Sequence, residues 1–382
     1  FGSDGIMRTA GVNEPRFDHD PITGQSLGLL IEETRINYFT YSDIEGSVGS
    51  TPTGAVVPYT SQGQSVVVST DVFLGPNGQS AKHTKGVQQN DSNTGYFNVG
   101  GVLTAGQTYC ASIWLYIPSS QAKNFAGKTI TFQAENVPSV TTTTAIFDTT
   151  LIGVWQRTFC VFTASTTGTS IIPRTNANAG SFFYTDCWQL ELGSFPTSYM
   201  PASGGSQFTR NPDNAYMIGT NFSSWYNQSE GSILVSTDKL ISGNFDTYRH
   251  YYVFSSGSGA NTITSYTVAN AIAITNYGIS NAGRQVFDYQ LINIGSSPTQ
   301  FKIGQALNSK YSFFTSSKGT TPPQLPSKSA PNGQNLSIPT NLTQLSIGCE
   351  YYTSFNKHIN SHIARLTYYP IQLTNQQLIN LS

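Results

Sequence analysis

The sequence of 382 residues carries very little charge. Asp, Glu, Lys and Arg together make up 10% of it and leave a net charge of −1, whereas these residues form about a quarter of an average soluble protein. No cluster of Lys and Arg is present, and such clusters are what proteins use to neutralise the phosphates of nucleic acids. The sequence therefore predicts that nucleic acid is not a partner.

Long apolar runs are also missing. No apolar stretch approaches the roughly 18 residues that indicate a transmembrane helix, so we predict no insertion into a membrane. The sequence begins at Phe1 and shows no pattern of a secretory signal peptide. We expect it to be part of a longer protein.

Cysteine is scarce. The four cysteines, Cys110, Cys160, Cys187 and Cys349, show none of the short spacings that are typical of zinc sites and redox motifs. We predict that they are buried free thiols, which pack like small apolar side chains. A Cys160–Cys187 disulfide is an alternative that the spacing does not decide. No cofactor is predicted, and a structural Ca²⁺ ion stays open as an alternative.

Glycine and aromatic residues, by contrast, are abundant, with 35 Gly, 21 Tyr and 22 Phe. Aromatic residues favour strands and glycine favours turns, so this composition predicts an all-β protein. Short apolar runs between turns recur along both halves of the sequence. We predict strands in residues 66–72, 109–117, 129–135, 154–163, 181–192, 214–218, 232–238, 248–254, 271–276, 285–294, 301–304 and 362–370.

Two local patterns give more detail. Ile130, Phe132 and Ala134 alternate with polar residues, which predicts a strand with one buried face. Thr374 and Gln377 have the spacing of a capping box, which predicts a short C-terminal helix with Leu378 and Leu381 directed inward. Residues 316–341 hold five prolines and are predicted to be an exposed insertion.

Three separate segments resemble parts of tailed-bacteriophage virion proteins. Residues 15–37, PRFDHDPITGQSLGLLIEETRIN, resemble the segment that leads into the β-sandwich domains of phage tail and appendage proteins. Residues 188–201, WQLELGSFPTSYMP, followed by Thr209-Arg210, resemble the end of a jelly-roll domain similar to carbohydrate-binding modules. Residues 362–381, HIARLTYYPIQLTNQQLINL, resemble the closing strand and helix of concanavalin-A-like (laminin-G-like) sandwiches.

The resemblance implies a fold of two tandem β-sandwiches behind an extended N-terminal strap. The strap comprises residues 1–37, the jelly-roll domain residues 38–203 and the concanavalin-A-like domain residues 204–382. Leu27, Leu29 and Ile31 belong to an apolar arm that we expect to form the first strand of the first sandwich.

The resemblance also implies a function. Such a chain is a structural component of the virion, a tail fibre, adhesin or other appendage, and binds host surface polysaccharide without catalysis. Its expected partners are other virion proteins and further copies of itself in a homo-oligomer. Two alternatives stay open, because sandwich folds host many functions. One is a capsid or tail decoration protein that makes only protein contacts, and the other is a tail-associated enzyme that degrades glycans.

Several short patterns could carry chemistry, but each has a simpler interpretation. Residues 24–28 match G-x-S-x-G, yet no alternation of strands and helices surrounds them, so we predict a plain turn. Asp18-His19-Asp20 precedes a proline-containing turn, and we predict turn capping rather than metal binding. His358 and His362 lack the glutamate of a zinc-binding H-E-x-x-H helix and are predicted to be surface histidines.

No carboxylate pair of a glycosidase can be identified. Glu32 and Glu33 are adjacent, so on a strand they point to opposite faces. The other carboxylates considered, Glu135, Asp148, Asp186 and Glu191, cannot be placed at a catalytic separation from sequence. We therefore predict no catalytic residue and no enzymatic activity.

Aromatic residues are the best candidates for binding. Tryptophans inside predicted strands are expected in the core, and these are Trp114, Trp155 and Trp188. Aromatic residues at strand ends or in loops are predicted to stack on sugar rings, and these are Trp225, Tyr226, Tyr248, Tyr351 and Tyr352. The alternative is that half of them belong to the core and the rest to ordinary surface or subunit contacts.

Overall fold

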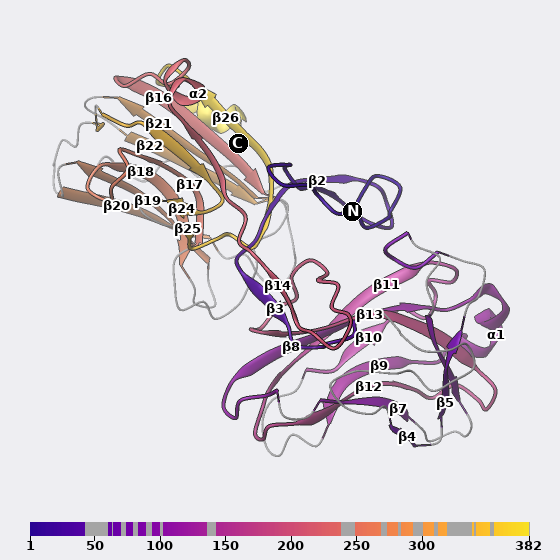
Figure 1. Ribbon diagram of the computed structural model, residues 1–382. Helices are drawn as coiled ribbons and strands as arrows, with labels where there is room; N and C mark the ends of the chain where they lie inside the picture. Colours follow the sequence, from indigo (N-terminus) through magenta and orange to yellow (C-terminus); the bar gives the residue numbers. More distant parts are fainter. Residues whose placement is uncertain are drawn as a thin grey trace. The chain divides into compact units, whose positions relative to one another are not determined.

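The computed structural model describes residues 1–42, 60–62, 64–69, 74–78, 83–88, 94–99, 102–135, 143–237, 249–268, 273–281, 284–292, 301–308, 312–318, 338–339, 341–351 and 355–381. The chain forms two compact units (Figure 1). The middle unit consists of Gly5–Arg8 and Thr34–Asn211. The terminal unit contains both ends of the chain and consists of Phe1–Asp4, Thr9–Glu33 and Pro212–Ser382.

The middle unit contains two five-stranded sheets and a two-stranded one. The first sheet has the order β11 (Trp155–Thr163), β8 (Thr108–Tyr116), β13 (Phe182–Leu192), β6 (His83–Gln88), β5 (Gln64–Ser69). The second has the order β10 (Ala145–Phe147), β9 (Ile130–Glu135), β12 (Thr169–Thr175), β7 (Thr94–Val99), β4 (Thr60–Gln62). Strands β14 (Phe208–Arg210) and β3 (Arg35–Asn37) form the third sheet, and η1 (Ser119–Gln121) and α1 (Ala122–Phe125) follow β8.

Alternation along the strands builds the core of the middle unit. Ile113 and Leu115 on β8 are buried in one cluster with Phe132 on β9 and Ile171 on β12, so both sheets contribute to it. The predicted burial of Ile130, Phe132 and Ala134 is confirmed. These residues lie on one face of β9 because successive side chains of a strand point to opposite sides.

The terminal unit contains two six-stranded sheets. The first has the order β1 (Phe17–His19), β2 (Ser26–Ile31), β26 (Ser361–Tyr369), β16 (Glu230–Thr237), β21 (Phe301–Asn308), β22 (Ser312–Lys318). The second has the order β15 (Ala215–Ile218), β23 (Gln344–Ile347), β17 (Arg249–Ser255), β18 (Thr262–Val268), β19 (Ala273–Asn281), β20 (Arg284–Ile292). Strand β24 (Glu350–Tyr351) pairs with β25 (Phe355–Asn356), and the helices are α2 (Thr220–Ser223) and α3 (Asn375–Leu381).

The core of the terminal unit also draws on both of its sheets. Ile233 and Ile303 come from the first sheet, and Phe254, Ile263 and Leu345 come from the second. The predicted all-β sandwich architecture is therefore confirmed. In the described part of the chain, no helix is both long and apolar enough to cross a membrane.

The N-terminal arm does not behave as predicted. Strand β2 pairs with β26 of the terminal unit, with Leu29 opposite Ile363, so the expectation that it begins the first sandwich was wrong. Ile31 is 2% exposed in the core of the terminal unit. The alternating apolar residues required a sheet to cover them, but the sequence did not indicate which one. The compact units accordingly divide the first 37 residues between them instead of leaving a separate strap.

Several smaller predictions were confirmed and two were not. Thr374 Oγ1 and Gln377 make the reciprocal capping-box hydrogen bonds at the start of α3, and Leu378 is buried. Leu381, however, is 42% exposed, because it lies at the end of the helix beyond the turn that packs. Trp155 is half-buried rather than core, although Trp114 and Trp188 are buried as predicted. Most of the predicted insertion at 316–341 lies outside the described residues.

The four cysteines are free and buried, as predicted. Burial raises the pKa of Cys160 and of Cys349 to about 12 in each case. A thiol must lose its proton to act as a nucleophile or a metal ligand. These two cysteines therefore serve as packing groups.

The buried His250 makes the terminal unit sensitive to acid. Thr264 Oγ1 donates to the carbonyl of Tyr252, so it accepts a hydrogen bond from His250 Nδ1 at 2.8 Å and keeps that nitrogen protonated. Burial, and secondarily the charge of Lys357, lowers the pKa of His250 to about 3 from its ordinary 6.5. Between pH 6.5 and 3, His250 therefore binds a proton in the unfolded state but not in the folded state.

We predict that stability is full above pH 6.5 and falls as the pH decreases from 6.5 to 3, by at most about 1.4 kcal/mol per pH unit from this group. Urea unfolding of the chain and of His250→Gln across this range measures the slope. The substitution is expected to reduce the dependence of the terminal unit's stability on pH. An unchanged slope would contradict the assignment to His250.

Candidate functional site

Of the five aromatic residues predicted to bind sugars, the structure describes the side chains of two. Trp225 and Tyr226 follow the short helix α2 in the terminal unit and are both half-buried. Tyr248 and Tyr352 lie outside the described residues, and of Tyr351 only the backbone, in β24, is described. The prediction can therefore be examined only at Trp225 and Tyr226.

Trp225 and Tyr226 form an aromatic cluster with Phe222, Phe254 and Tyr368. Tyr226 stacks on Phe222 with ring centroids 4.7 Å apart, and it lies 5.6 Å from Tyr368. Trp225 meets Tyr368 edge-on at 5.0 Å. Phe222 and Phe254 are buried members of the core, so they fix the other three rings from below.

Several polar groups in and beside the aromatic cluster already have partners. Trp225 Nε1 donates to the carbonyl of Asn221 at 2.6 Å, and Asn227 Nδ2 donates to the carbonyl of Pro370 at 2.8 Å. Burial, and the nearby Tyr368, raises the pKa of Tyr226, so its phenol stays neutral and cannot act as an acid or base near neutral pH. What the cluster offers to a ligand is the apolar face of a ring.

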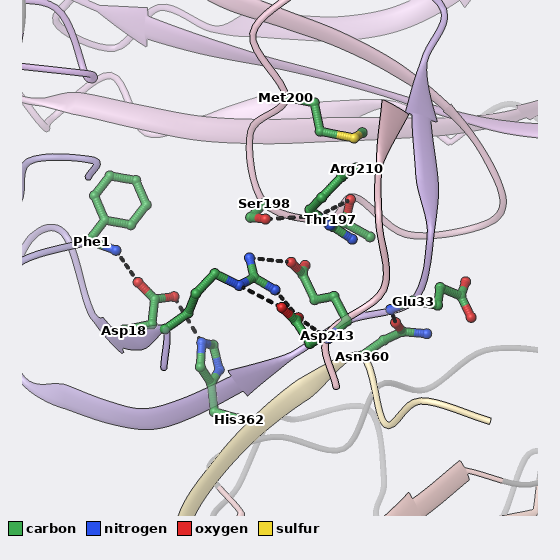
Figure 2. A network of polar contacts seen from close by, with 12 residues as sticks. Phe1, Asp18, Glu33, Thr197, Ser198, Met200, Arg210, Asp213, Asn360 and His362 are labelled. Atoms are coloured by element: carbon green, nitrogen blue, oxygen red, sulfur yellow. Dashed lines mark hydrogen bonds and ion pairs between the residues drawn. The ribbon is translucent and has the colours of Figure 1, made fainter. Parts of the chain in front are cut away.

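A second feature of the terminal unit is a polar network around Arg16 (Figure 2). Arg16 Nη1 donates to Glu32 Oε2 at 3.0 Å, and Arg16 Nε donates to Asp213 Oδ1 at 3.1 Å. Asp213 Oδ2 also accepts the backbone N–H of Glu32 at 2.7 Å. The one guanidinium offsets part of the negative charge of the two carboxylates, and this arrangement joins the N-terminal arm to the segment that follows β14.

Glu33 points away from Arg16, as the prediction of opposite faces required. Its carboxylate pairs with Arg249. Its backbone N–H donates to Asn360 Oδ1 at 2.7 Å, a contact that Figure 2 shows. The two adjacent glutamates therefore bind two different arginines. They do not form a glycosidase pair.

Of the two histidines predicted at the surface, His358 is buried and His362 is half-buried. His358 is 3% exposed and its Nε2 lies 3.0 Å from the carbonyl of Asp213, while His362 Nε2 lies 2.8 Å from Asp18 Oδ2. Burial lowers the pKa of His358 despite the neighbouring Asp213. The sequence placed both residues beside a turn, but it gave no sign that the N-terminal arm would cover that turn.

Asp18 and Asp20 have separate structural functions. Asp20 Oδ1 accepts the backbone N–H groups of Ile22 and Thr23 at 2.9 and 2.7 Å, so the predicted turn capping is confirmed. Burial alone would raise the pKa of Asp18, but hydrogen bonds from His362 and from the Phe1 nitrogen lower it to about 2. Within the described ranges, no group of three or more His, Cys, Asp or Glu side chains could hold a metal ion.

The G-x-S-x-G pattern begins in a turn, as predicted, but its last three residues belong to β2. Gly24 has φ of +70° and closes the turn between β1 and β2, and Gly28 has φ of +102° inside β2. Ser26 is exposed at the start of β2. No helix follows it, so the strand–turn–helix setting of a nucleophile is absent at this point of the chain.

In the middle unit, the second recognised segment forms its own network. Glu191 is buried and accepts hydrogen bonds from Gln189 Nε2 at 2.6 Å and from the backbone of Thr197 at 2.9 Å. Arg210 Nη1 donates to Ser198 Oγ at 2.8 Å, a contact also drawn in Figure 2. The Thr-Ser-Tyr turn and the Thr-Arg pair thus meet at the end of β13.

The remaining carboxylates considered from sequence are also structural where they are described. Asp148 caps Thr150, and Asp186 pairs with the buried His83 at 3.0 Å. The side chain of Glu135 lies outside the described residues. The His83–Asp186 pair was missed, because these residues are a hundred positions apart in unremarkable contexts and only the pairing of β6 with β13 joins them.

Comparisons with known proteins give weak likenesses only. No family model matches the sequence, and no curated protein matches it. Tailspike protein 2 of an Escherichia coli O157:H7 bacteriophage is 13% identical over 38% of this chain and 20% of its own, with a TM-score of 0.30. The CBM40 of a Ruminococcus gnavus IT-sialidase is 10% identical over 41% of this chain and 83% of its own, with a TM-score of 0.32. This chain spans a fifth of the tailspike, and such low scores say nothing about function.

Proposed function

We propose that this chain is a structural component of a tailed-phage particle, a tail fibre, adhesin or other appendage, and that it binds host surface glycans without catalysis. In this proposal the middle unit is the jelly-roll domain and the terminal unit is the concanavalin-A-like domain. The chain acts in the virion, as a homo-oligomer in contact with other virion proteins.

The observation that carries the proposal is the position of the three recognised segments. The first and the last, far apart in sequence, pair with each other as β2 and β26, with Leu30 opposite His362. The second segment forms the closed network of Gln189, Glu191 and Arg210. The residues that resemble segments of phage proteins are therefore the ones that build the frame of each sandwich. None of them forms a catalytic group, which favours a structural component over an enzyme.

The aromatic cluster supports glycan binding. Sugar rings expose apolar C–H faces, and aromatic side chains with one free face are suited to cover them. Trp225, Tyr226 and Tyr368 are half-buried rather than fully buried, so the rings combine a fixed position with some accessible surface. We propose that Trp225 provides the main contact.

We predict that Trp225→Ala lowers the affinity of the whole chain for its host polysaccharide at least about tenfold, which corresponds to about 1.4 kcal/mol. Phe17→Ala is the matched control, because Phe17 is a 62% exposed ring of the same unit that lies outside the aromatic cluster. Isothermal titration measures both, and Trp225→Leu tests whether apolar bulk alone suffices. Equal affinities of Trp225→Ala and the unchanged chain would contradict the assignment of Trp225.

The proposal as a whole is tested by a glycan array and by the position of the chain in an intact virion. The whole chain must be used, because β1 and β2 complete a sheet of the terminal unit. Binding to host polysaccharide and a distal position are the expected results. A chain that binds no glycan and lies among capsid or tail subunits would be a decoration protein, and depolymerisation of host polysaccharide would establish the enzyme.

A further inference from the structure

One face of the first sheet of the terminal unit contains a groove with two cations. Strands β21, β16 and β26 lie side by side there (Figure 1). The register places Lys302 opposite Ser236 and Ser236 opposite Arg365, so the three side chains form a row across three strands. Neighbouring strands are about 4.8 Å apart, so the two cations flank a gap of about 10 Å between their backbones.

Two further rows of paired residues lie beside the first one. Gly304 lies opposite Leu234, and Leu234 lies opposite Thr367, so one position of this second row has no side chain. Helix α3 covers the third row, where Leu378 packs on Ala306. Leu234 of the second row also packs against this cluster, whereas Lys302 and Arg365 of the first row are exposed. The lining residues are Leu234, Ser236, Lys302, Arg365, Thr367 and Tyr369, together with Val235 and Leu381.

Among the described residues, no acidic side chain forms an ion pair with the cations of the groove. Lys302 and Arg365 are both exposed, and among the described residues neither forms an ion pair. Arg365 Nε donates to Thr367 Oγ1 at 3.0 Å. This hydrogen bond orients the guanidinium and does not use its two terminal nitrogens. In a chain with so few charged residues, two cations in one row without a carboxylate partner suggest an anionic ligand.

We propose that this groove binds a carboxylate-bearing sugar residue of an acidic polysaccharide. The proposal rests on the proposed glycan binding and names the class of glycan. Arg365 binds the carboxylate through its planar pair of N–H groups, and Lys302 approaches it from the opposite strand. Ser236 lies between them and Thr367 lies next to Arg365 on β26, with hydroxyl groups for the ring hydroxyls, and Tyr369 borders the ring.

Isothermal titration of the whole chain with three small ligands tests this assignment. The ligands are trigalacturonate, the neutral maltotriose, and triglutamate, which carries carboxylates but no sugar. We expect trigalacturonate to bind at least tenfold more tightly than the other two. Arg365→Gln and Lys302→Gln are each expected to weaken it at least tenfold. Lys123→Gln removes an exposed cation of the middle unit and is expected to have no effect. Thermal melting confirms that each variant is folded.

Each other result overturns the proposal. Equal binding of triglutamate would mean a cationic patch without specificity for sugar. Binding of trigalacturonate that neither Arg365→Gln nor Lys302→Gln weakens would place the anion elsewhere. If trigalacturonate fails to bind while host polysaccharide binds in a way that depends on Trp225, only the groove assignment is wrong. If the chain binds no glycan at all, the proposed function fails with it.

Discussion

Replacing Gly28 by alanine is expected to unfold or detach the N-terminal arm of the terminal unit. Gly28 has φ of +102°, and a Cβ there would lie 2.4 Å from the carbonyl oxygen of Ile363 and 2.6 Å from Ala364 Cα. Both are backbone atoms of β26, so they cannot turn aside as a flexible side chain could. The left-handed conformation alone costs about 1–3 kcal/mol for other residues, and the lost pairing of β2 adds to this.

The effect is measured as the change in the calorimetric transition of the terminal unit. Gly257→Ala is the matched control, because Gly257 has φ of +85° in the same unit but open space around its Cβ position. This control measures the cost of the left-handed conformation without the clash with β26. Ile31→Ala, which deletes a buried side chain of the same arm, is expected to cost about 2–5 kcal/mol, whereas Leu30→Asp alters a half-buried side chain and is expected to cost less. A Gly28→Ala variant as stable as Gly257→Ala would contradict the close packing of β2 on β26.

Asn37 is the position at which a single substitution should most affect the middle unit. Its side chain is fully buried and makes four hydrogen bonds to the backbone. Nδ2 donates to the carbonyls of Met200 and Trp188 at 2.9 and 3.3 Å, and Oδ1 accepts the N–H groups of Leu190 and Phe39 at 3.0 and 3.1 Å. One amide therefore joins the start of the unit, its strand β13 and the turn that closes it.

Asn37→Ala leaves these buried backbone groups without that partner, and each orphaned group costs about 1–3 kcal/mol. We expect a total loss of several kcal/mol, with the transition of the terminal unit nearly unchanged. Asn37→Asp is expected to be equally damaging, because it removes both donors and buries a charge. Asn176→Ala removes an exposed amide that accepts one hydrogen bond, from Thr129, and serves as the control. A loss at Asn37 no larger than at Asn176 would disprove the structural function of this side chain.

The candidate binding residues could be predicted only in part. Aromatic side chains in loops were visible in the sequence, and Trp225 and Tyr226 do lie together in one cluster. The groove of Lys302 and Arg365 was not predictable, because these residues are distant in sequence and each looks like an ordinary surface cation. They become neighbours only through the register of β21, β16 and β26. The exposed face of a sheet is assembled from separate strands, so its chemistry is a property of pairing.

The sequence by itself determined the all-β class, the positions of about half of the strands, the burial of the cysteines and the C-terminal helix cap. These features depend on local patterns, such as alternation at period two and the spacing of a capping box. The tertiary structure alone decided where the N-terminal arm belongs. The apolar residues at 27–31 show that one face of the arm is covered, but any apolar sheet edge can cover it. The choice of β26 depends on the left-handed Gly28 at the backbone of Ile363 and on the pairing of Arg16 with Asp213. Contacts between residues so far apart leave no local pattern in the sequence.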